Sequence, residues 1–153
     1  MSMSGAPPQD SVPSYSTLVV GTGSIGERHV RCFQKTGRAQ VSVCESNPAV
    51  RERVAGACDV RGAFADLDEA LDGRRYDVAV VATPAPLHVP MARRLVAHRC
   101  HVLVEKPLST SFDGIRELHA EVGRQGVTAA VAYVYRAHPA LRALRDALRS
   151  GEY

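Results

Sequence analysis

The chain has 153 residues, of which 45% are hydrophobic and 23% charged, and its formal net charge is +3. These proportions are those of one globular domain with a buried core. No apolar run approaches the roughly 20 residues of a membrane-spanning helix. The basic residues are dispersed and aromatic residues make up only 5% of the chain, so we expect neither a membrane nor a nucleic acid as a partner.

The first 16 residues, MSMSGAPPQDSVPSYS, are rich in serine and proline. They have neither the basic start nor the apolar run of a secretory signal, so we predict a disordered tail over residues 1–16 and one domain over residues 17–153. The four cysteines show no metal-ligand spacing and no C-x-x-C pair. We expect them to be small buried side chains in a reducing compartment, which favours a cytoplasmic protein without a metal site.

Beyond the tail, short apolar runs alternate with amphipathic segments. The apolar runs predict strands at residues 18–20, 41–44, 58–61, 78–82, 101–104 and 127–134. The amphipathic segments predict helices at residues 24–36, 48–55, 66–72, 87–97, 110–122 and 138–149. This alternation is typical of βαβ units, and it predicts an α/β fold: a doubly wound, parallel-sheet Rossmann fold with helices on both faces.

Some helices also carry signals for their starts and their buried faces. Asn47 and Pro48 supply a cap and a first residue for the second helix. Thr110 and Asp113 have capping-box spacing at the start of the fifth, and Phe112 is expected on its buried stripe. Inward-facing stripes are expected on two further helices: Leu87, Met91 and Leu95 on one, and Leu141, Leu144 and Leu148 on the last.

The turn after the first predicted strand reads GTGSIG, residues 21–26, and matches G-x-G-x-x-G. Gly21 permits the tight turn, Gly23 lets the backbone approach a pyrophosphate, and Gly26 allows the helix to pack closely on the strand. Unpaired amides at the helix start, which includes Ser24 and Ile25, would face the phosphates. The strand before and the helix after favour a dinucleotide site over a purely structural turn.

Glu45 lies at the end of the second predicted strand, 19 residues after Gly26. A carboxylate there can accept hydrogen bonds from both hydroxyls of an adenosine ribose, and it would repel a 2′-phosphate. The position therefore favours NAD over NADP. NADP remains an alternative cofactor, because Arg51 or Arg53 could reach a 2′-phosphate. For Glu45, the alternative is an acid at the end of a strand that is simply solvated.

Glu105, Lys106 and Pro107 follow the fifth predicted strand directly. The chain has 17 arginines and only two lysines, so a lysine at this position suggests that an ammonium is preferred to a guanidinium there. An ammonium is compact, and it can hydrogen-bond a hydroxyl and stabilise a developing alkoxide. A plain Glu–Lys pair at the end of a strand is the alternative.

The glycine loop, TPAPLH at 83–88, EKP at 105–107 and YRAHP at 135–139 together resemble the Gfo/Idh/MocA family of oxidoreductases. The resemblance implies a Rossmann domain followed in the family by a C-terminal α/β domain, which is absent from this chain. It also implies hydride transfer between a nicotinamide cofactor and a sugar, cyclitol or related polyol.

The resemblance assigns expected roles to single residues. Lys106 would reach the nicotinamide and the reacting oxygen of the substrate, with Glu105 beside the cofactor and Pro107 after a cis bond. Residues at the nicotinamide end would be Thr83, Pro84 and His88. His88 is equally well explained as a helix-start residue, and Arg136 is either near the active site or on a plain surface.

Two features depart from the family pattern. Arg99 stands where a glycine often precedes the fifth strand, and a side chain there is strained if φ is positive. The family's catalytic Asp and His lie in its second domain, so we expect this chain to bind NAD but to turn over sugars poorly. One alternative is a non-catalytic module that docks on a catalytic partner or on a second copy of itself. Another is a different Rossmann enzyme such as a methyltransferase, but that hypothesis leaves the EKP motif unexplained.

Overall fold

The structure, a computed structural model, describes residues 14–151. The predicted tail, residues 1–16, lies mostly outside the described residues, and its last two residues belong to the first strand. That strand starts early because the amide of Tyr15 donates to the carbonyl of Arg38 at 2.8 Å, next to the second strand. Between residues 14 and 151, no helix combines the length and apolar character needed to traverse a bilayer.

Six parallel strands form a single sheet in the order β3-β2-β1-β4-β5-β6. They are Tyr15–Val20 (β1), Ala39–Cys44 (β2), Ala63–Phe64 (β3), Val78–Val81 (β4), His101–Val104 (β5) and Ala129–Val131 (β6). The chain winds outward from β1 in one direction and then from β4 in the other. The predicted doubly wound Rossmann fold is confirmed, and the switch point lies between β1 and β4.

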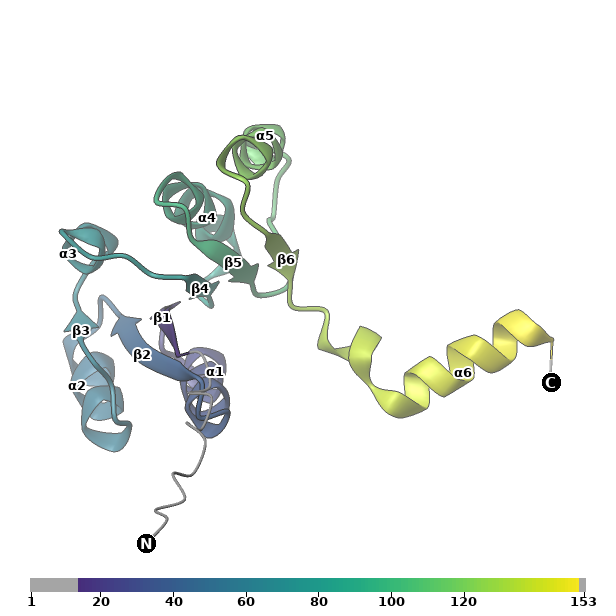
Figure 1. The fold of residues 1–153 in the computed structure, drawn as a ribbon, viewed down its shortest axis with the longest axis horizontal. Helices are drawn as coiled ribbons and strands as arrows, with labels where there is room; N and C mark the ends of the chain where they lie inside the picture. Colours follow the sequence, from purple (N-terminus) through teal and green to yellow (C-terminus); the bar gives the residue numbers. More distant parts are fainter. Residues whose placement is uncertain (1–13, 152–153) are drawn as a thin grey trace, which may run out of the picture.

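Helices cover both faces of this sheet (Figure 1). They are Ser24–Lys35 (α1), Pro48–Ala57 (α2), Leu67–Leu71 (α3), His88–Ala97 (α4), Ile115–Gln125 (α5) and Pro139–Ser150 (α6), with short 3₁₀ turns at Ala85–Leu87 (η1) and Val134–Ala137 (η2). One core cluster joins the sheet to α3, α4 and α5, and the other joins it to α1 and α2. Figure 1 shows α6 reaching away from the sheet.

The core follows from the two-residue period of a strand. Leu18 and Val81 pack toward α3, α4 and α5, whereas Val19 and Val80 pack toward α1 and α2, and all four are fully buried. Continuous apolar strands are required because successive side chains point to opposite, equally covered faces. Burial of each such side chain contributes about 1.5–3 kcal/mol.

The third strand lies at Ala63–Phe64 and not at the predicted residues 58–61. Its position is set by pairing with β2: the amide of Val43 donates to the carbonyl of Gly62, and the amide of Glu45 to that of Phe64, both at 2.9 Å. This pairing is a tertiary contact, which the weak local pattern did not reveal. The sixth strand is also shorter than the predicted 127–134.

The fifth helix begins at Ile115, so the predicted start at Thr110 is wrong. The Ser111 hydroxyl bonds the side chain and the amide of Asp113, at 3.0 and 3.2 Å, and Gly114 then takes a left-handed φ of 74°. These local bonds compete with helix formation. Phe112, which was expected in the core, is 93% exposed.

Two backbone expectations after α4 are met. Arg99 has a positive φ of 60°, a conformation that costs a side-chain-bearing residue about 1–2 kcal/mol. The bond between Lys106 and Pro107 is cis, as the resemblance implies.

The predicted inward face of the last helix is wrong. No residue of α6 is buried, and its three stripe residues, Leu141, Leu144 and Leu148, are 45%, 55% and 53% exposed. We refer to residues 15–131 as the sheet body and to residues 134–150, which comprise η2 and α6, as the C-terminal arm.

Candidate functional site

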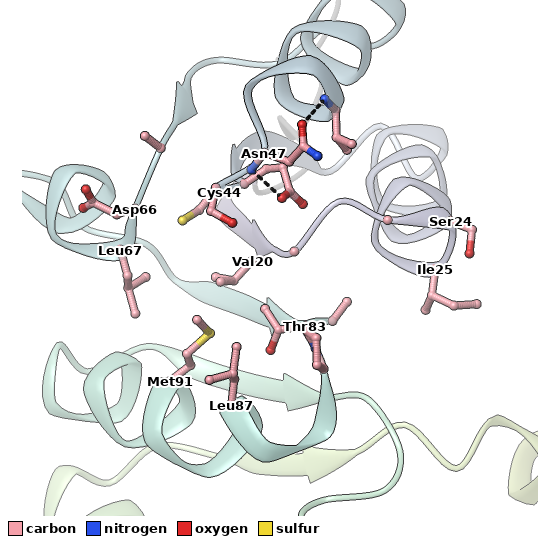
Figure 2. Close-up of a pocket in the computed structure, with 18 of the residues that line it drawn as sticks. Val20, Ser24, Ile25, Cys44, Asn47, Asp66, Leu67, Thr83, Leu87 and Met91 are labelled. Atoms are coloured by element: carbon pink, nitrogen blue, oxygen red, sulfur yellow. Dashed lines mark hydrogen bonds between the residues drawn. The ribbon is translucent and has the colours of Figure 1, made fainter.

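A cleft of about 650 Å³ opens at the carboxyl ends of β1, β2 and β4. Figure 2 shows its walls: the start of α1 and the end of β2 on one side, and α4 with the loop after β4 on the other. Predicted site residues that line it are Gly21, Gly23, Ser24, Ile25, Glu45, Thr83 and Pro84. This edge, at the switch point, is where open α/β sheets bind ligands.

Packing requires two of the three glycines of the loop, and the third borders open space. A Cβ at Gly26 would lie 1.8 Å from the carbonyl oxygen of Gly21, and a Cβ at Gly21 would lie 2.9 Å from the backbone of Ala82. Gly21 also has a φ of 81°. By contrast, a Cβ at Gly23 would meet nothing within 4 Å. Packing therefore explains Gly21 and Gly26, whereas the open space at Gly23 is available to a ligand.

Helix α1 begins at this cleft without a side-chain cap, because its N-cap residue is Gly23. The helices that follow β2 and β3 are capped: Asn47 accepts from two amides of α2, and Asp66 accepts from the amide of Glu69 in α3. Uncapped first-turn amides and the positive end of the helix dipole suit an anion. Among these three helices, α1 alone leaves that capacity to a bound group.

Glu45 forms part of the cleft wall, with its carboxylate held against the glycine loop. One oxygen, Oε2, accepts from the amide of Thr22 at 2.8 Å and from its hydroxyl at 3.3 Å, and Oε1 accepts from the amide of Asn47 at 3.0 Å. A carboxylate offers about four lone-pair sites. These three donors therefore leave Glu45 oriented and still able to accept from a ligand hydroxyl.

The opposite wall contains residues that sequence reasoning had not assigned to a site. Leu87 and Met91 line the cleft from the start of α4, and Leu87 is 44% exposed. They were expected in the core together with Leu95, which is fully buried. The stripe thus continues past the core into the cleft. Leu87 lies at the end of the helix that faces the carboxyl edge of the sheet, and this position was the sequence signal for a place in the cleft.

An unpartnered polar atom lies between these walls. The hydroxyl oxygen of Thr83 is buried and has no hydrogen-bond partner among the described residues. Burying a hydroxyl without a partner costs about 1–3 kcal/mol. The hydroxyl of Thr17 in β1 is equally buried and unpartnered within residues 14–151 but does not line the cleft, so it is the glycine cradle and the uncapped helix that fit a dinucleotide.

Lys106 lies beyond the end of β5, outside the lining of the cleft. The amide of Glu105 donates to the carbonyl of Val81 at 2.8 Å, which places this turn beside the end of β4. The Glu105 carboxylate contacts the ring of His29 at 2.9 Å and the backbone amide of Lys106 at 3.1 Å. Within residues 14–151 no ion pair joins the side chains of Glu105 and Lys106, and His29 was not predicted as a site residue.

The remaining two predicted residues do not line the cleft. His88 is 1% exposed, and its ring nitrogens lie 2.7 Å from the carbonyl oxygen of Thr83 and 2.8 Å from that of Pro107. This geometry leaves no ring nitrogen for direct contact with a ligand. Arg136 is exposed in η2, away from the cleft lining. The described residues also contain no cluster of histidine, cysteine or acidic side chains able to hold a metal.

Comparisons with known proteins agree with this geometry. The family model described as "Oxidoreductase family, NAD-binding Rossmann fold" matches residues 15–133. Inositol 2-dehydrogenase from Rubrobacter xylanophilus is 32% identical over 140 residues, which cover 87% of this chain and 39% of the relative. The chain thus spans about two fifths of the length of that relative.

Solved structures show the same fold. The WlbA dehydrogenase from Bordetella pertussis, in complex with NADH and UDP-GlcNAcA, matches with a TM-score of 0.83 and 26% identity, covering 90% of this chain and 42% of that one. Scyllo-inositol dehydrogenase from Lactobacillus casei, with bound NAD(H) and scyllo-inositol, matches at 17% identity with a TM-score of 0.83, which supports the fold alone. With the family model matched along nearly the whole sheet body, the chain belongs to the Gfo/Idh/MocA oxidoreductases and carries their NAD-binding Rossmann fold.

Proposed function

We propose that this chain is the cofactor-binding part of an oxidoreductase that moves hydride between NAD and a sugar, cyclitol or related polyol. The observation that carries the proposal is the uncapped start of α1, which faces an open cleft beside Gly23. The relatives support the substrate class: one is named an inositol dehydrogenase, and one binds a nucleotide sugar.

Contacts around Glu45 support NAD over NADP. Arg51 and Arg53 were the side chains that could have received a 2′-phosphate. Arg51 instead donates to the backbone carbonyl of Glu45 at 2.6 Å, and Arg53 pairs with Glu27 at 2.6 Å. Within the described residues, no salt bridge engages the Glu45 carboxylate, which lines the cleft, so a 2′-phosphate there would meet its negative charge.

The proposed chemistry divides the work among a few residues. NAD would supply the hydride acceptor or donor at its nicotinamide ring. The first turn of α1 would hold the diphosphate, Glu45 would accept from a ribose hydroxyl, and Thr83 would lie at the nicotinamide end. The Lys106 ammonium would hydrogen-bond the reacting oxygen and stabilise negative charge on it. A base from the family's second domain would take the proton, so we expect this chain alone to bind NAD without efficient turnover.

Isothermal titration with NADH tests this proposal, using Gly23→Ala as the variant and Gly56→Ala as the control. A Cβ at either position meets nothing within 4 Å, so both variants should fold. We expect Gly23→Ala to bind NADH at least about tenfold more weakly, or about 1.4 kcal/mol, because its methyl occupies the space of the diphosphate. Gly56→Ala should bind like the parent chain. Equal affinity in all three chains, or no binding at millimolar NADH, would remove the proposal.

The exposed leucines of α6 fit the proposed function, in which a second domain packs against this helix, and they equally fit a second, non-catalytic possibility: a module that binds NAD and docks on a partner domain. The two proposals differ in one measurement. If the chain contributes to catalysis, adding a C-terminal domain from a related dehydrogenase should produce NADH-linked polyol oxidation. A stable complex without any activity would favour the docking module.

A further inference from the structure

The turn at residues 105–107 is attached to two helices through two histidines, neither of which lines the cleft. His29 belongs to α1 and contacts the carboxylate of Glu105. His88 opens α4 and contacts the carbonyl of Pro107. Lys106 stands between these two attachment points. Because neither histidine lines the cleft, contact with a ligand does not explain them. Their contacts with this turn suggest a different role.

The contact from α1 fixes the carboxylate that begins the turn. His29 and Glu105 have side chains that are only 17% and 15% exposed, and their closest atoms, Nε2 and Oε1, are 2.9 Å apart. The other oxygen of Glu105 accepts from the backbone amide of Lys106 at 3.1 Å. With both oxygens bonded, the carboxylate has one orientation, and the backbone of Lys106 is tied through it to α1.

The contact from α4 joins the turn to the loop after β4. Both ring nitrogens of His88 face carbonyl oxygens, those of Thr83 and Pro107. Carbonyls only accept, so the ring donates an N–H to at least one of these two oxygens and lies against the other. His88 is 1% exposed, which makes these bonds costly to break. The loop at the expected nicotinamide end and the Lys106 turn are therefore held at a fixed separation.

We propose that His29 and His88 are positioning residues for Lys106, which couple the turn at 105–107 to the two helices that begin at the cleft. The inference rests on the proposed function, because it requires that Lys106 responds to the cofactor. α1 begins at the glycine loop and also carries His29. Ordering of its first turn by NADH is thus transmitted through the His29–Glu105 pair to the backbone of Lys106.

The chain's composition allows a direct test. Its only lysines are Lys35 and Lys106, so reductive methylation with ¹³C-formaldehyde labels two side chains and the N-terminus, and it preserves their charge. Lys35 lies at the far end of α1 and serves as an internal reference. We expect NADH to shift the ¹³C signal of Lys106 and to leave that of Lys35 in place. NADH affinity is measured in parallel by titration calorimetry.

Four variants separate positioning from simple stability. His29→Leu removes the ring donor and His29→Gln retains an N–H donor, whereas His88→Gln replaces the ring with an amide, whose single nitrogen cannot repeat both contacts of the ring. His119→Leu is the control, because His119 is exposed on α5. We expect the NADH-induced shift of Lys106 to fall by about half or more in His29→Leu and His88→Gln, to recover in His29→Gln, and to be unchanged in His119→Leu.

The outcomes distinguish this inference from the proposed function. If the parent chain binds NADH but its Lys106 signal does not move, the role of Lys106 itself fails. If the parent signal moves and the full shift persists in His29→Leu and His88→Gln, the positioning role fails and the proposed function stands. Where His29→Leu does not fold, Glu105→Gln interrupts the same pair from the other side, and an undiminished shift there also overturns the inference.

Discussion

The sheet body and the C-terminal arm have similar amphipathic patterns but opposite environments. In the sheet body, α4 buries Val89, Ala92 and Leu95, which pack on the sheet. In the arm, α6 has an equally regular leucine stripe and buries nothing. The contrast teaches that an amphipathic pattern identifies which face of a helix is apolar. Whether that face is buried depends on what packs against it, either elsewhere in the chain or in another molecule.

The largest difference is expected when a leucine is shortened in each region. Leu18→Ala should lower the free energy of unfolding by about 2–5 kcal/mol, because Leu18 is fully buried between the sheet and its helices. Leu144→Ala should change it by less than about 0.5 kcal/mol, since Leu144 is 55% exposed. Urea denaturation followed by circular dichroism measures both. Comparable losses would mean that α6 is packed on the sheet body in solution.

A second comparison uses Gly26 of the sheet body and Gly151, the C-cap residue directly after the arm. Gly26→Ala brings a methyl group to 1.8 Å from the Gly21 carbonyl, so we expect a loss of about 1–3 kcal/mol or more. Gly151→Ala meets no atom within 4 Å and strains only a left-handed φ of 75°. That strain costs about 1–2 kcal/mol locally and should fray the end of α6 without lowering the melting temperature of the sheet body. Equal shifts in melting temperature would contradict the comparison.

The arm should also control association. We expect the chain to self-associate as its concentration rises, because the leucines of α6 form an exposed apolar stripe. Leu144→Glu should weaken that association about tenfold, since burying one leucine contributes about 1.5–3 kcal/mol. Sedimentation velocity over a concentration series measures it, with Leu18→Val as a control outside the arm. A parent chain that stays monomeric at high concentration would show that the stripe is not used this way.

The smallest effect concerns thiol chemistry. Burial raises the pKa of the Cys44 thiol to about 12, with the nearby Asp66 and Glu45 adding to the rise. At pH 8 only about one in ten thousand of these thiols is ionised, so Cys44 should resist iodoacetamide. In a Cys32→Ser background, Leu144→Cys should react like a thiol in a short peptide. Rapid labelling of Cys44 in the folded chain, read by mass spectrometry, would show that the sheet body opens at β2.

How much of this molecule the sequence reveals depends on how local each signal is. The glycine loop and Glu45 could be placed at one cleft because strand, turn and helix are adjacent in the chain. The start of α5 could not be predicted correctly, because hydrogen bonds between Ser111 and Asp113 take the place of helical hydrogen bonds there. Gly114 then fixed the first residue through its left-handed φ.

Long-range partners explain the other omissions. His29 gave no recognisable spacing because Glu105 lies 76 residues away. Leu87 and Met91 are predicted as core residues because a stripe shows only that a face is apolar. The cleft that exposes one end of the stripe is completed by the glycine loop and the end of β2, which are distant in the chain. The predicted inward position of the α6 leucines was wrong for the same reason, because their burial depends on what packs opposite them.

The strand order has a consequence for the time course of folding. Thr17 in β1 pairs with Val78 in β4, so the two central strands meet across 61 positions of chain (78 − 17). Closing such a loop costs entropy before any contact compensates for it, and parallel pairings of this kind form slowly. During synthesis, the first strand must therefore wait for the fourth to leave the ribosome, and until then one of its edges remains open to a chaperone or to a neighbouring nascent chain.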